Sequence, residues 1–403
     1  MKRKSLLKIS ALALLAFTQF ACENAKEDAI DNLVYINEAS TGKTKEMTMQ
    51  EGTTRTSLTI RLAKAVEQDV KAHLFMNEAL LSAYNKKNET NYKLPAKENI
   101  SFPEEAIIKA GNVSADPIDI DVKDFDTEGA QYAIPLAISS VEGGIDKAEA
   151  SSGFILVLVK PLRQLVPKFT WYNGMKAAPT EEDWNLSLSN YTLEWWSKVT
   201  SKNGNGGYTT NNQAVINSGS GSSELYIRFG DLIYASGGRY MNNFMQVKTM
   251  GSQFDTGDPT QGHGLEAMKW YHFALTYDAS TGTTILYQNG TQVGTLTTSA
   301  GKPMIINQFQ MISSGQQYFP DFCELCQVRL WNVTRTANQI KKGMYAEVEH
   351  TDKNLILYLP MNEGTGNILH DVTGNGHDVE IGSMYPSNSN RHNVTWDTYL
   401  FAQ

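Results

Sequence analysis

Apolar and polar residues alternate in short runs along the whole chain of 403 residues, a pattern that predicts strands rather than long helices. The alternation is clearest over 57–62 and 118–122, and 153–159 is a continuous apolar run of strand length. Between these runs, 77–85 has the spacing of one short helix and begins with an asparagine, which is a capping residue. We therefore expect residues 32–160 to form a β-sandwich with a helical insertion.

The strand pattern is stronger after 161–168, a linker with a proline near each end. Residues 270–278 alternate and place four apolar side chains on one face, which we expect to be the core face: Tyr271, Phe273, Leu275 and Tyr277. Residues 284–294 form the clearest hairpin, because their central Asn289-Gly290 pair accepts the positive φ angles of a type I′ turn. The chain is therefore predicted to be all-β, with a sandwich or jelly roll over 169–403.

Composition and charge exclude two classes of protein. Hydrophobic residues make up 41% of the chain, enough to offset the entropy lost on ordering, so we do not expect disorder over most of its length. The 35 Lys and Arg residues are outnumbered by 43 Asp and Glu residues, which gives a net charge of -8. A nucleic-acid-binding protein usually presents a basic face to the phosphates, so nucleic acid is not an expected partner.

Residues 1–21 have the pattern of a secretory signal peptide. Four basic residues lie within the first eight positions, and the apolar run that follows over 9–17 is too short to span a membrane. Cys22 comes next and resembles the cysteine of a bacterial lipobox, although Gln19 and Phe20 depart from the usual residues. In that family the cysteine is lipidated and becomes the mature N terminus. The alternative interpretation is an ordinary signal peptide with an incidental cysteine.

Residues 22–31 would then be an acidic tether. The acid-rich run over 23–28 resembles the export signal that directs lipoproteins of the Bacteroidetes to the outside of the outer membrane. Such a run can also be a plain solvated tether. The resemblance implies a lipid-anchored protein of the outer membrane that faces the cell surface.

Three motifs stand out in the N-terminal part: Tyr84-Asn85, 92–95 and 132–136. They resemble the amino-terminal β-sandwich of unknown function found on many Bacteroidetes surface lipoproteins. The resemblance covers about the first third of the mature chain. It implies a spacer or a docking role for residues 32–160, and it implies no chemistry.

The C-terminal part carries a more specific set of motifs in order: 270–278 with its hairpin, 328–332 with a short helix near 336–344, 357–366 and 371–376. They resemble the laminin-G-like, concanavalin-A-type lectin family. The resemblance implies a concanavalin-A-like β jelly roll over 169–403. Trp195 stands where the family usually has a small residue, and Cys326 lies near a position that is often acidic.

The residue types that bind metals do not form a recognisable site in the sequence. Cys323 and Cys326 lack the second pair that a zinc site needs, and positions three apart on a strand point to opposite faces, so we expect two unpaired thiols. His370 and His377 flank a turn without metal-binding spacing. Laminin-G-like domains can hold a calcium ion, but Asp371 is expected to bond its own turn amides, so we predict no metal and no cofactor.

Hydrolysis is the weaker hypothesis for this domain. Retaining glycosidases on a jelly roll place two carboxylates about 5 Å apart on one strand face. The acidic candidates here are 181–183, which would cap a turn, and Glu194, and no strand carries the spacing E-x-D-x-x-E. We therefore predict no catalytic residue and no enzyme.

Sugar binding is the stronger hypothesis, because sugar sites combine aromatic faces with planar amides and charged groups that bond hydroxyls. Three stretches have this composition, over 203–212, 234–243 and 316–318. The expected ligand contacts are Tyr208, Asn211, Tyr234, Arg239, Tyr240 and Tyr318.

The sequence thus predicts a cell-surface lipoprotein that binds an oligo- or polysaccharide, as part of a system that captures and takes up polysaccharide or host glycans. An importer and hydrolases would be its partners. The alternative is a structural or adhesion protein that binds a protein partner in a surface complex. A glycoside hydrolase with an unrecognised acid pair is the third hypothesis.

Overall fold

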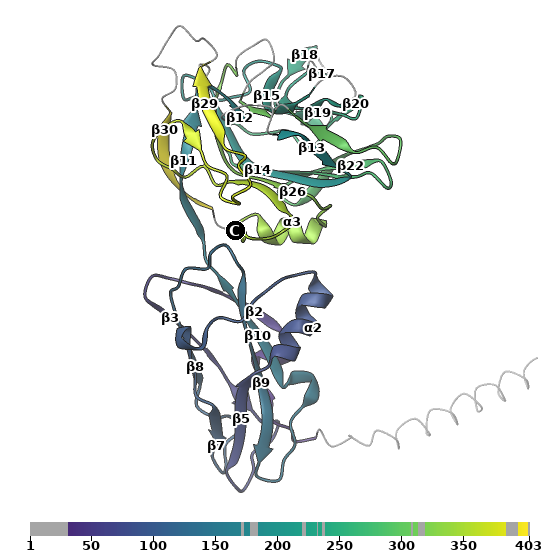
Figure 1. The fold of residues 1–403 in the computed structure, drawn as a ribbon. Coiled ribbons are helices and arrows are strands. Elements are labelled where there is room, and N and C mark those ends of the chain that lie inside the picture. The colour runs from purple at the N-terminus through teal and green to yellow at the C-terminus, as the bar shows by residue number, and fades with distance from the viewer. Residues whose placement is uncertain are drawn as a thin grey trace, which may run out of the picture. The chain divides into compact units, whose positions relative to one another are not determined.

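The structure of the protein is a computed structural model that describes residues 31–170, 173–177, 184–219, 223–231, 233–235, 238–307, 309–312, 319–383 and 394–401. Its contacts divide the chain into two compact units (Figure 1). Unit 1 contains the residues up to Leu81 together with Leu94–Asp124 and Ala133–Val157; unit 2 contains Ser82–Lys93, Phe125–Tyr132 and Leu158–Gln403. The sequence placed the boundary at 160 and assigned 82–93 and 125–132 to the N-terminal domain, whereas the contacts assign these two segments to unit 2.

In the described residues, unit 1 contains three sheets. The order of the largest is β2 (Thr44–Thr48), β10 (Gly153–Val159), β9 (Tyr132–Glu142), β5 (Val70–Met76) and β7 (Glu105–Ile108). The second is β3 (Thr53–Leu58), β8 (Ile118–Lys123) and β6 (Ile100–Ser101), and the third pairs β1 (Tyr35–Ile36) with β4 (Ile60–Arg61). The alternation seen in the sequence is the reason for this arrangement: Ile118, Ile120 and Val122 are buried, whereas the residues between them are more exposed.

The helical insertion expected after the first strands is α2 (Glu78–Asn88). Its cap is the expected one, because the Oδ1 atom of Asn77 accepts a hydrogen bond of 3.1 Å from the backbone N–H of Leu80. The sequence prediction of this helix is therefore confirmed.

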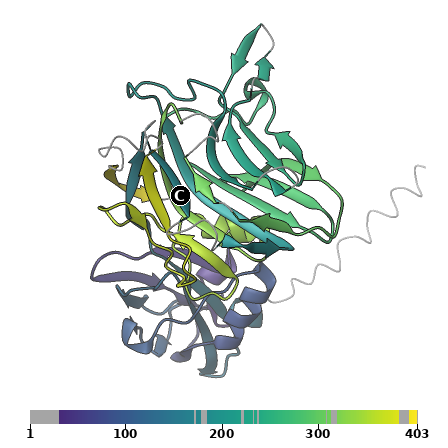
Figure 2. The ribbon, with the colours of Figure 1, turned by 45° about the horizontal axis from the view of Figure 1, so that its top comes forward.

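Unit 2 is a sandwich of two large antiparallel sheets, here called sheet A and sheet B, in the part of the chain that the structure describes (Figures 1 and 2). Sheet A runs in the order β23 (Thr291–Thr297), β22 (Thr283–Gln288), β21 (Tyr271–Asp278), β14 (Asn190–Thr200), β26 (Phe322–Trp331), β11 (Leu162–Phe169) and β30 (Thr395–Phe401), and β27 (Leu355–Leu359) pairs with β26. Sheet B runs in the order β20 (Ser252–Asp255), β19 (Met245–Thr249), β16 (Leu225–Phe229), β15 (Gln213–Ser218), β25 (Gln310–Met311), β12 (Asn173–Ala177), β29 (Val379–Ser383) and β28 (Ile368–Leu369).

Two short strand pairs complete unit 2: β13 (Leu186–Leu188) with β24 (Met304–Ile306), and β17 (Ile233–Ala235) with β18 (Arg239–Met241). The β17–β18 hairpin projects from the sandwich beside the ends of β19 and β20 (Figures 1 and 2). The predicted all-β architecture, with a jelly-roll sandwich in the C-terminal part, is confirmed.

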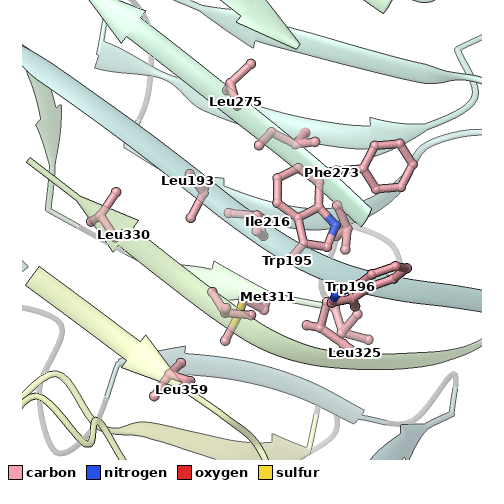
Figure 3. Close-up of a cluster of buried hydrophobic side chains, with 14 of the residues drawn as sticks. Leu193, Trp195, Trp196, Ile216, Phe273, Leu275, Met311, Leu325, Leu330 and Leu359 are labelled. Carbon is pink, nitrogen blue, oxygen red and sulfur yellow. The ribbon is translucent and has the colours of Figure 1, made fainter. Parts of the chain in front are cut away.

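The core of unit 2 lies between the two sheets and is dominated by aromatic and aliphatic side chains (Figure 3). Trp195 of β14 and Phe273 of β21 are fully buried and stack with ring centroids 5.4 Å apart. The four residues expected on the core face of 270–278 all lie in this cluster, which confirms the predicted face: Tyr271, Phe273, Leu275 and Tyr277.

The predicted hairpin joins β22 to β23. Asn289 and Gly290 have φ angles of 50° and 73°, as a type I′ turn requires. The short helix expected near 336–344 is α3 (Ala337–Gly343), whose N-cap Thr336 forms a capping box with Gln339. These predictions of local structure are confirmed.

Candidate functional site

A hollow of about 300 Å³ opens in unit 2 where three loops meet. The loops are the β14–β15 connection, the β17–β18 hairpin with the residues that follow it, and the connection from β20 to β21. The lining residues are mostly small, aromatic or amide-bearing: Gly206, Gly207, Tyr208, Tyr240, Met241, Asn242, Asn243, Leu265 and Ala267. We call this feature the rim hollow.

The first wall of the rim hollow is a turn rich in glycine and asparagine. The backbone N–H of Ser201 donates to the carbonyl of Gly206 at 2.7 Å, and the Ser201 hydroxyl donates to the carbonyl of Asn205 at 2.6 Å. A Cβ atom on Gly207 would lie 2.9 Å from the carbonyl oxygen of Val199 and 3.1 Å from the Cβ atom of Ala267. Only glycine lets the turn pack this closely, so at this point the wall is bare backbone.

The far side of the same loop is anchored by a buried carboxylate. Asp321 is 1% exposed and accepts hydrogen bonds from the backbone N–H of Thr209 at 2.8 Å and from the Thr209 hydroxyl at 2.6 Å. The amide of Gln213 donates to the same carboxylate at 2.9 Å. Charge-assisted hydrogen bonds of this kind fix the loop before any ligand arrives.

The third wall, the connection from β20 to β21, is fastened to the rest of unit 2 by two hydrogen bonds. The N–H of Met268 donates to the carbonyl of Val199 at 2.9 Å, and the N–H of Glu266 donates to the hydroxyl of Tyr271 at 2.9 Å. Gly230 has a φ angle of 70°, and a Cβ atom there would lie 3.0 Å from the Cα of Asn242 and 3.1 Å from the Cα of Asn211. The glycine therefore lets the loops that carry these two asparagines approach each other.

The structure brings two of the predicted ligand contacts, Tyr208 and Tyr240, into this one hollow. Tyr240 is 59% exposed. Tyr208 is 7% exposed and its ring packs edge-on against Phe229, with centroids 5.4 Å apart. Burial raises the pKa of Tyr208 well above its ordinary value, so its hydroxyl stays protonated at neutral pH.

The other four predicted ligand contacts are not among the described lining residues of the hollow. Asn211 is not among the lining residues; its Cα atom lies beside Gly230, which also packs against Asn242. Tyr234 and Arg239 lie in the paired strands β17 and β18, with Tyr234 opposite Tyr240, but their side chains are outside the description. Tyr318 and the lipidation candidate Cys22 lie outside the described residues.

Sequence reasoning missed the lining residues Leu265 and Ala267. They come from a connection with no aromatic or amide signal, and long-range hydrogen bonds bring them to the hollow. Asn242 and Asn243 lay in a stretch that the sequence singled out, so their composition was the available signal.

A second polar region covers the outer face of β16 and β19. Arg228 donates to Gln246 at 3.0 Å and to Asn212 at 2.8 Å, and it pairs with Asp231 at 2.6 Å. The guanidinium also lies 5.4 Å from the centroid of the Tyr226 ring. These side chains use their hydrogen-bonding groups on one another, so we interpret the region as a network that stabilises the sheet rather than as a binding surface.

Glu194, the carboxylate that the hydrolase hypothesis required, is fully buried on the face of β14 opposite the core. It is paired with Arg335, and its Oε2 atom lies 3.4 Å from Nε2 of His272. Burial alone would raise the pKa of Glu194, but Arg335 and His272 outweigh burial and hold this pKa well below its ordinary value. A buried, permanently ionised carboxylate in an ion pair is unsuited to donate a proton to a glycosidic oxygen. Residues 181–183 lie outside the described residues.

The remaining candidates for metal or redox chemistry are two buried cysteines and a carboxylate that bonds its own turn. Cys323 and Cys326 are unpaired, as predicted, and fully buried; burial raises the pKa of both thiols well above the ordinary value. Asp371 accepts hydrogen bonds from the N–H of Thr373 at 3.1 Å and from its hydroxyl at 2.7 Å, which confirms the predicted turn role.

Two features are absent from the described residues, a metal-binding cluster and a membrane-spanning helix. Over these ranges, no group of three or more His, Cys, Asp or Glu side chains could hold a metal ion. Within the same part of the chain, no helix is both long and apolar enough to cross a membrane.

Comparison with protein families gives one match for each half of the chain. Residues 173–341 match the family described as the concanavalin A-like lectin/glucanases superfamily. Residues 30–145 match a family of N-terminal domains. No curated protein matches the chain in sequence.

Comparison with solved structures extends the likeness over both halves. A candidate carbohydrate-binding protein from Bacteroides ovatus is 20% identical, covers 92% of this chain and 99% of its own, and superposes with a TM-score of 0.57. A two-domain protein of unknown function from Bacteroides fragilis is 12% identical over 74% of this chain and 95% of its own, with a TM-score of 0.29. A pentraxin from Limulus polyphemus is 12% identical over 44% of this chain and 80% of its own, with a TM-score of 0.32. The first of these similarities shows a shared fold.

Proposed function

We propose that the protein binds a glycan in the rim hollow. Its residues 173–341 form a domain of the concanavalin A-like lectin/glucanases superfamily. The Bacteroides ovatus protein with the same fold is a candidate carbohydrate-binding protein, which makes the same function a reasonable expectation for this one. Fold similarity alone does not locate a ligand, so the proposal rests on the site.

The observation that carries the proposal is the exposed ring of Tyr240 beside the amides of Asn242 and Asn243, over a hollow of about 300 Å³. An aromatic face accepts the C–H groups of a pyranose ring, and planar amides bond its hydroxyls. The loops around this hollow are fixed by Asp321 and by backbone bonds, so little ordering entropy is lost when a sugar binds.

We also propose that the protein is a lipoprotein, anchored through Cys22 in the outer membrane and facing the cell surface. The signal-like pattern of 1–21 and the acid-rich run of 23–28 support this proposal. In this position the protein would hold polysaccharide or host glycan close to an importer and its hydrolases. Replacement of Cys22 by serine is then expected to move the protein from the membrane fraction to the soluble fraction, and to abolish labelling with a fatty acid.

Adhesion to a protein partner is the second candidate function, because the same sandwich can present a surface for either ligand. The exposed tyrosine and the two asparagines that line the rim hollow suit a sugar better than a flat apolar protein interface. Hydrolysis has less support, since Glu194 is buried in an ion pair with Arg335.

The deciding experiment is a glycan array probed with residues 23–403, followed by titration calorimetry with the best ligand and with free ligand as competitor. Replacement of Tyr240 by alanine is expected to lower affinity at least tenfold. The matched control is Leu400→Ala, which removes a side chain of similar exposure (55%) from β30 and is expected to leave affinity unchanged. A blank array at micromolar protein would overturn the glycan proposal in favour of adhesion.

A further inference from the structure

We propose that Arg228 is a positioning residue for the rim hollow, because it links the loop that carries Tyr208 to the base of the hairpin that carries Tyr240. This inference rests on the proposed glycan-binding function and adds to it a residue that holds two walls of the site in a fixed relative position. Arg228 lies on β16, on the face opposite the core, and is not itself a lining residue.

The guanidinium of Arg228 bonds three segments of unit 2 at once. Its Nη1 atom donates to Oδ1 of Asn212, the last residue before β15, at 2.8 Å. Its Nε atom donates to Oε1 of Gln246 on β19 at 3.0 Å, and its Nη2 atom pairs at 2.6 Å with Asp231, which lies between β16 and β17. A guanidinium presents its donors in a rigid planar fork, so these bonds fix the segments relative to one another.

The base of the β17–β18 hairpin is closed by the same group of residues. Asp231 precedes the hairpin and Gln246 follows it, and the Nε2 atom of Gln246 donates to Oδ2 of Asp231 at 2.9 Å. The N–H of Gly230 donates to the carbonyl of Phe244 at 2.9 Å, which joins the two ends of the segment through the backbone as well. The hairpin that carries Tyr240 therefore leaves the sandwich and returns to it at fixed points.

Asn212 connects the first wall of the hollow to this base. Its N–H donates to the carbonyl of Gly230 at 3.1 Å, and its Oδ1 atom accepts a hydrogen bond of 2.9 Å from the hydroxyl of Tyr226 in addition to the one from Arg228. Asn212 has a φ angle of 61°, a left-handed conformation that asparagine adopts more readily than most residues. Tyr208 lies earlier in the same loop, so its position is tied to that of the hairpin base.

Burial makes the network resist opening. Arg228 is 7% exposed and Gln246 is 3% exposed. A buried charged or amide group that loses its partner is left without a hydrogen bond, so the closed arrangement is favoured over one in which either loop moves away. Two walls of the hollow are thus set in place before a glycan arrives, which reduces the ordering entropy lost on binding.

Two variants break the link from opposite ends. Asn212→Gly removes the side-chain oxygen without backbone strain, because glycine accepts a φ angle of 61°. Arg228→Lys replaces the fork by a single ammonium, which is expected to stay with the carboxylate of Asp231 and to release Asn212. Glu128→Gly is the matched control, since Glu128 has a φ angle of 47° and an exposed side chain outside the lining of the hollow.

Amide hydrogen exchange of residues 23–403 tests the link without any ligand. Asn212→Gly and Arg228→Lys should each speed exchange at least tenfold both in the loop 201–212 and at 242–243, because loops held by few bonds open locally. Glu128→Gly should speed exchange in neither segment. Faster exchange in only one of the two segments, or in neither, overturns the proposal.

Calorimetry with the best ligand of the glycan array tests the effect on binding. Each variant is expected to lower the affinity about fivefold, the effect of losing one hydrogen bond. The double variant should lose no more than either single variant, because both break the same bond. A residue that only stabilises the fold would leave the affinity of the folded protein unchanged well below its melting temperature, and Glu128→Gly should bind like the wild type.

The outcomes distinguish this proposal from the glycan function. Binding that depends on Tyr240 and keeps its wild-type affinity in Asn212→Gly and Arg228→Lys overturns the positioning role and leaves the glycan function standing. If no glycan of the array binds in a Tyr240-dependent way, the proposed function fails and the positioning role fails with it, even where the exchange experiment shows that the two loops are linked.

Discussion

Asn243 and Leu265 are joined by two hydrogen bonds in opposite directions: the Leu265 N–H donates to the carbonyl of Asn243 at 2.8 Å, and the Asn243 side chain donates to the carbonyl of Leu265 at 2.9 Å. The two residues are 22 positions apart, and they join the segment after β18 to the connection between β20 and β21. This pair holds one edge of the rim hollow closed. The site therefore depends on a contact that no local sequence pattern encodes.

The first prediction concerns this pair. Asn243→Ala removes the side-chain bond and leaves the Leu265 carbonyl without that donor, which is expected to cost about 1 kcal/mol of unfolding free energy. Glycan affinity should fall at least tenfold, because the edge of the hollow loosens and one amide is lost. Urea unfolding and calorimetry measure the two effects. Asn203→Ala, at an exposed position of the neighbouring loop, is the control; an equal loss there would contradict the role given to Asn243.

A second prediction follows from the close approach at Gly230. Alanine at this position would be strained by the positive φ angle, and its Cβ atom would also lie too close to the Cα atoms of Asn211 and Asn242. Alanine at Gly301 has a similar φ (82°) but nothing within 4 Å of its Cβ atom, so it isolates the conformational cost. We expect Gly230→Ala to destabilise by more than Gly301→Ala, which should cost about 1 kcal/mol, and only Gly230→Ala to weaken glycan binding. Equal melting temperatures and affinities for the two variants would refute this.

Local elements of this fold could be predicted because single residues determine them. Asn77 caps α2 through its own side chain, and Asn289-Gly290 selects the hairpin turn by its backbone freedom. The core face of β21 follows from strict alternation, since each of its inward residues must be apolar. In these cases the physical cause lies within a few residues of its effect.

The site could be predicted only in part because its cause is not local. Tyr208 and Tyr240 lie in loops of the same composition, yet one ring packs into the core and the other is exposed. Composition identifies residues that suit a sugar but does not tell on which side of a loop they lie. Leu265 and Ala267 carry no signal at all, since apolar residues are equally common in a core.

The third prediction concerns the ion pair behind sheet A. Glu194 is fully buried and Arg335 is largely buried, so Glu194→Gln is expected to leave an uncompensated cation and to destabilise unit 2 by about 3–5 kcal/mol. The double variant Glu194→Leu with Arg335→Met removes both charges and should recover most of that loss, as judged by urea unfolding. Glycan affinity of the folded variants should be unchanged, because neither residue lines the rim hollow. A double variant no more stable than Glu194→Gln would show that the buried cation is not the cause.

The fourth prediction is a dependence of stability on pH through His272. This residue is 1% exposed, and burial lowers its pKa below the ordinary value of 6.5, with Arg329 and Arg335 adding to burial and Glu194 opposing it. The folded protein therefore keeps His272 neutral, whereas the unfolded chain takes up a proton as the pH falls through about 6.5. The unfolded state then binds more protons, so stability falls with decreasing pH, by up to about 1.4 kcal/mol per pH unit for this one group.

Glu194 contributes in the same direction but at lower pH. Its pKa is also lowered on folding, so its stabilising effect is complete above the unfolded value near 4.5 and is lost as the pH falls below that value. Between pH 7 and pH 5 Glu194 therefore adds little, and we expect His272 to supply part of the slope. Urea unfolding of His272→Gln over this range should give a flatter profile than the wild type, whereas His263→Gln, at an exposed histidine, should keep the wild-type slope. If His272→Gln keeps that slope too, the buried imidazole is not the group that titrates.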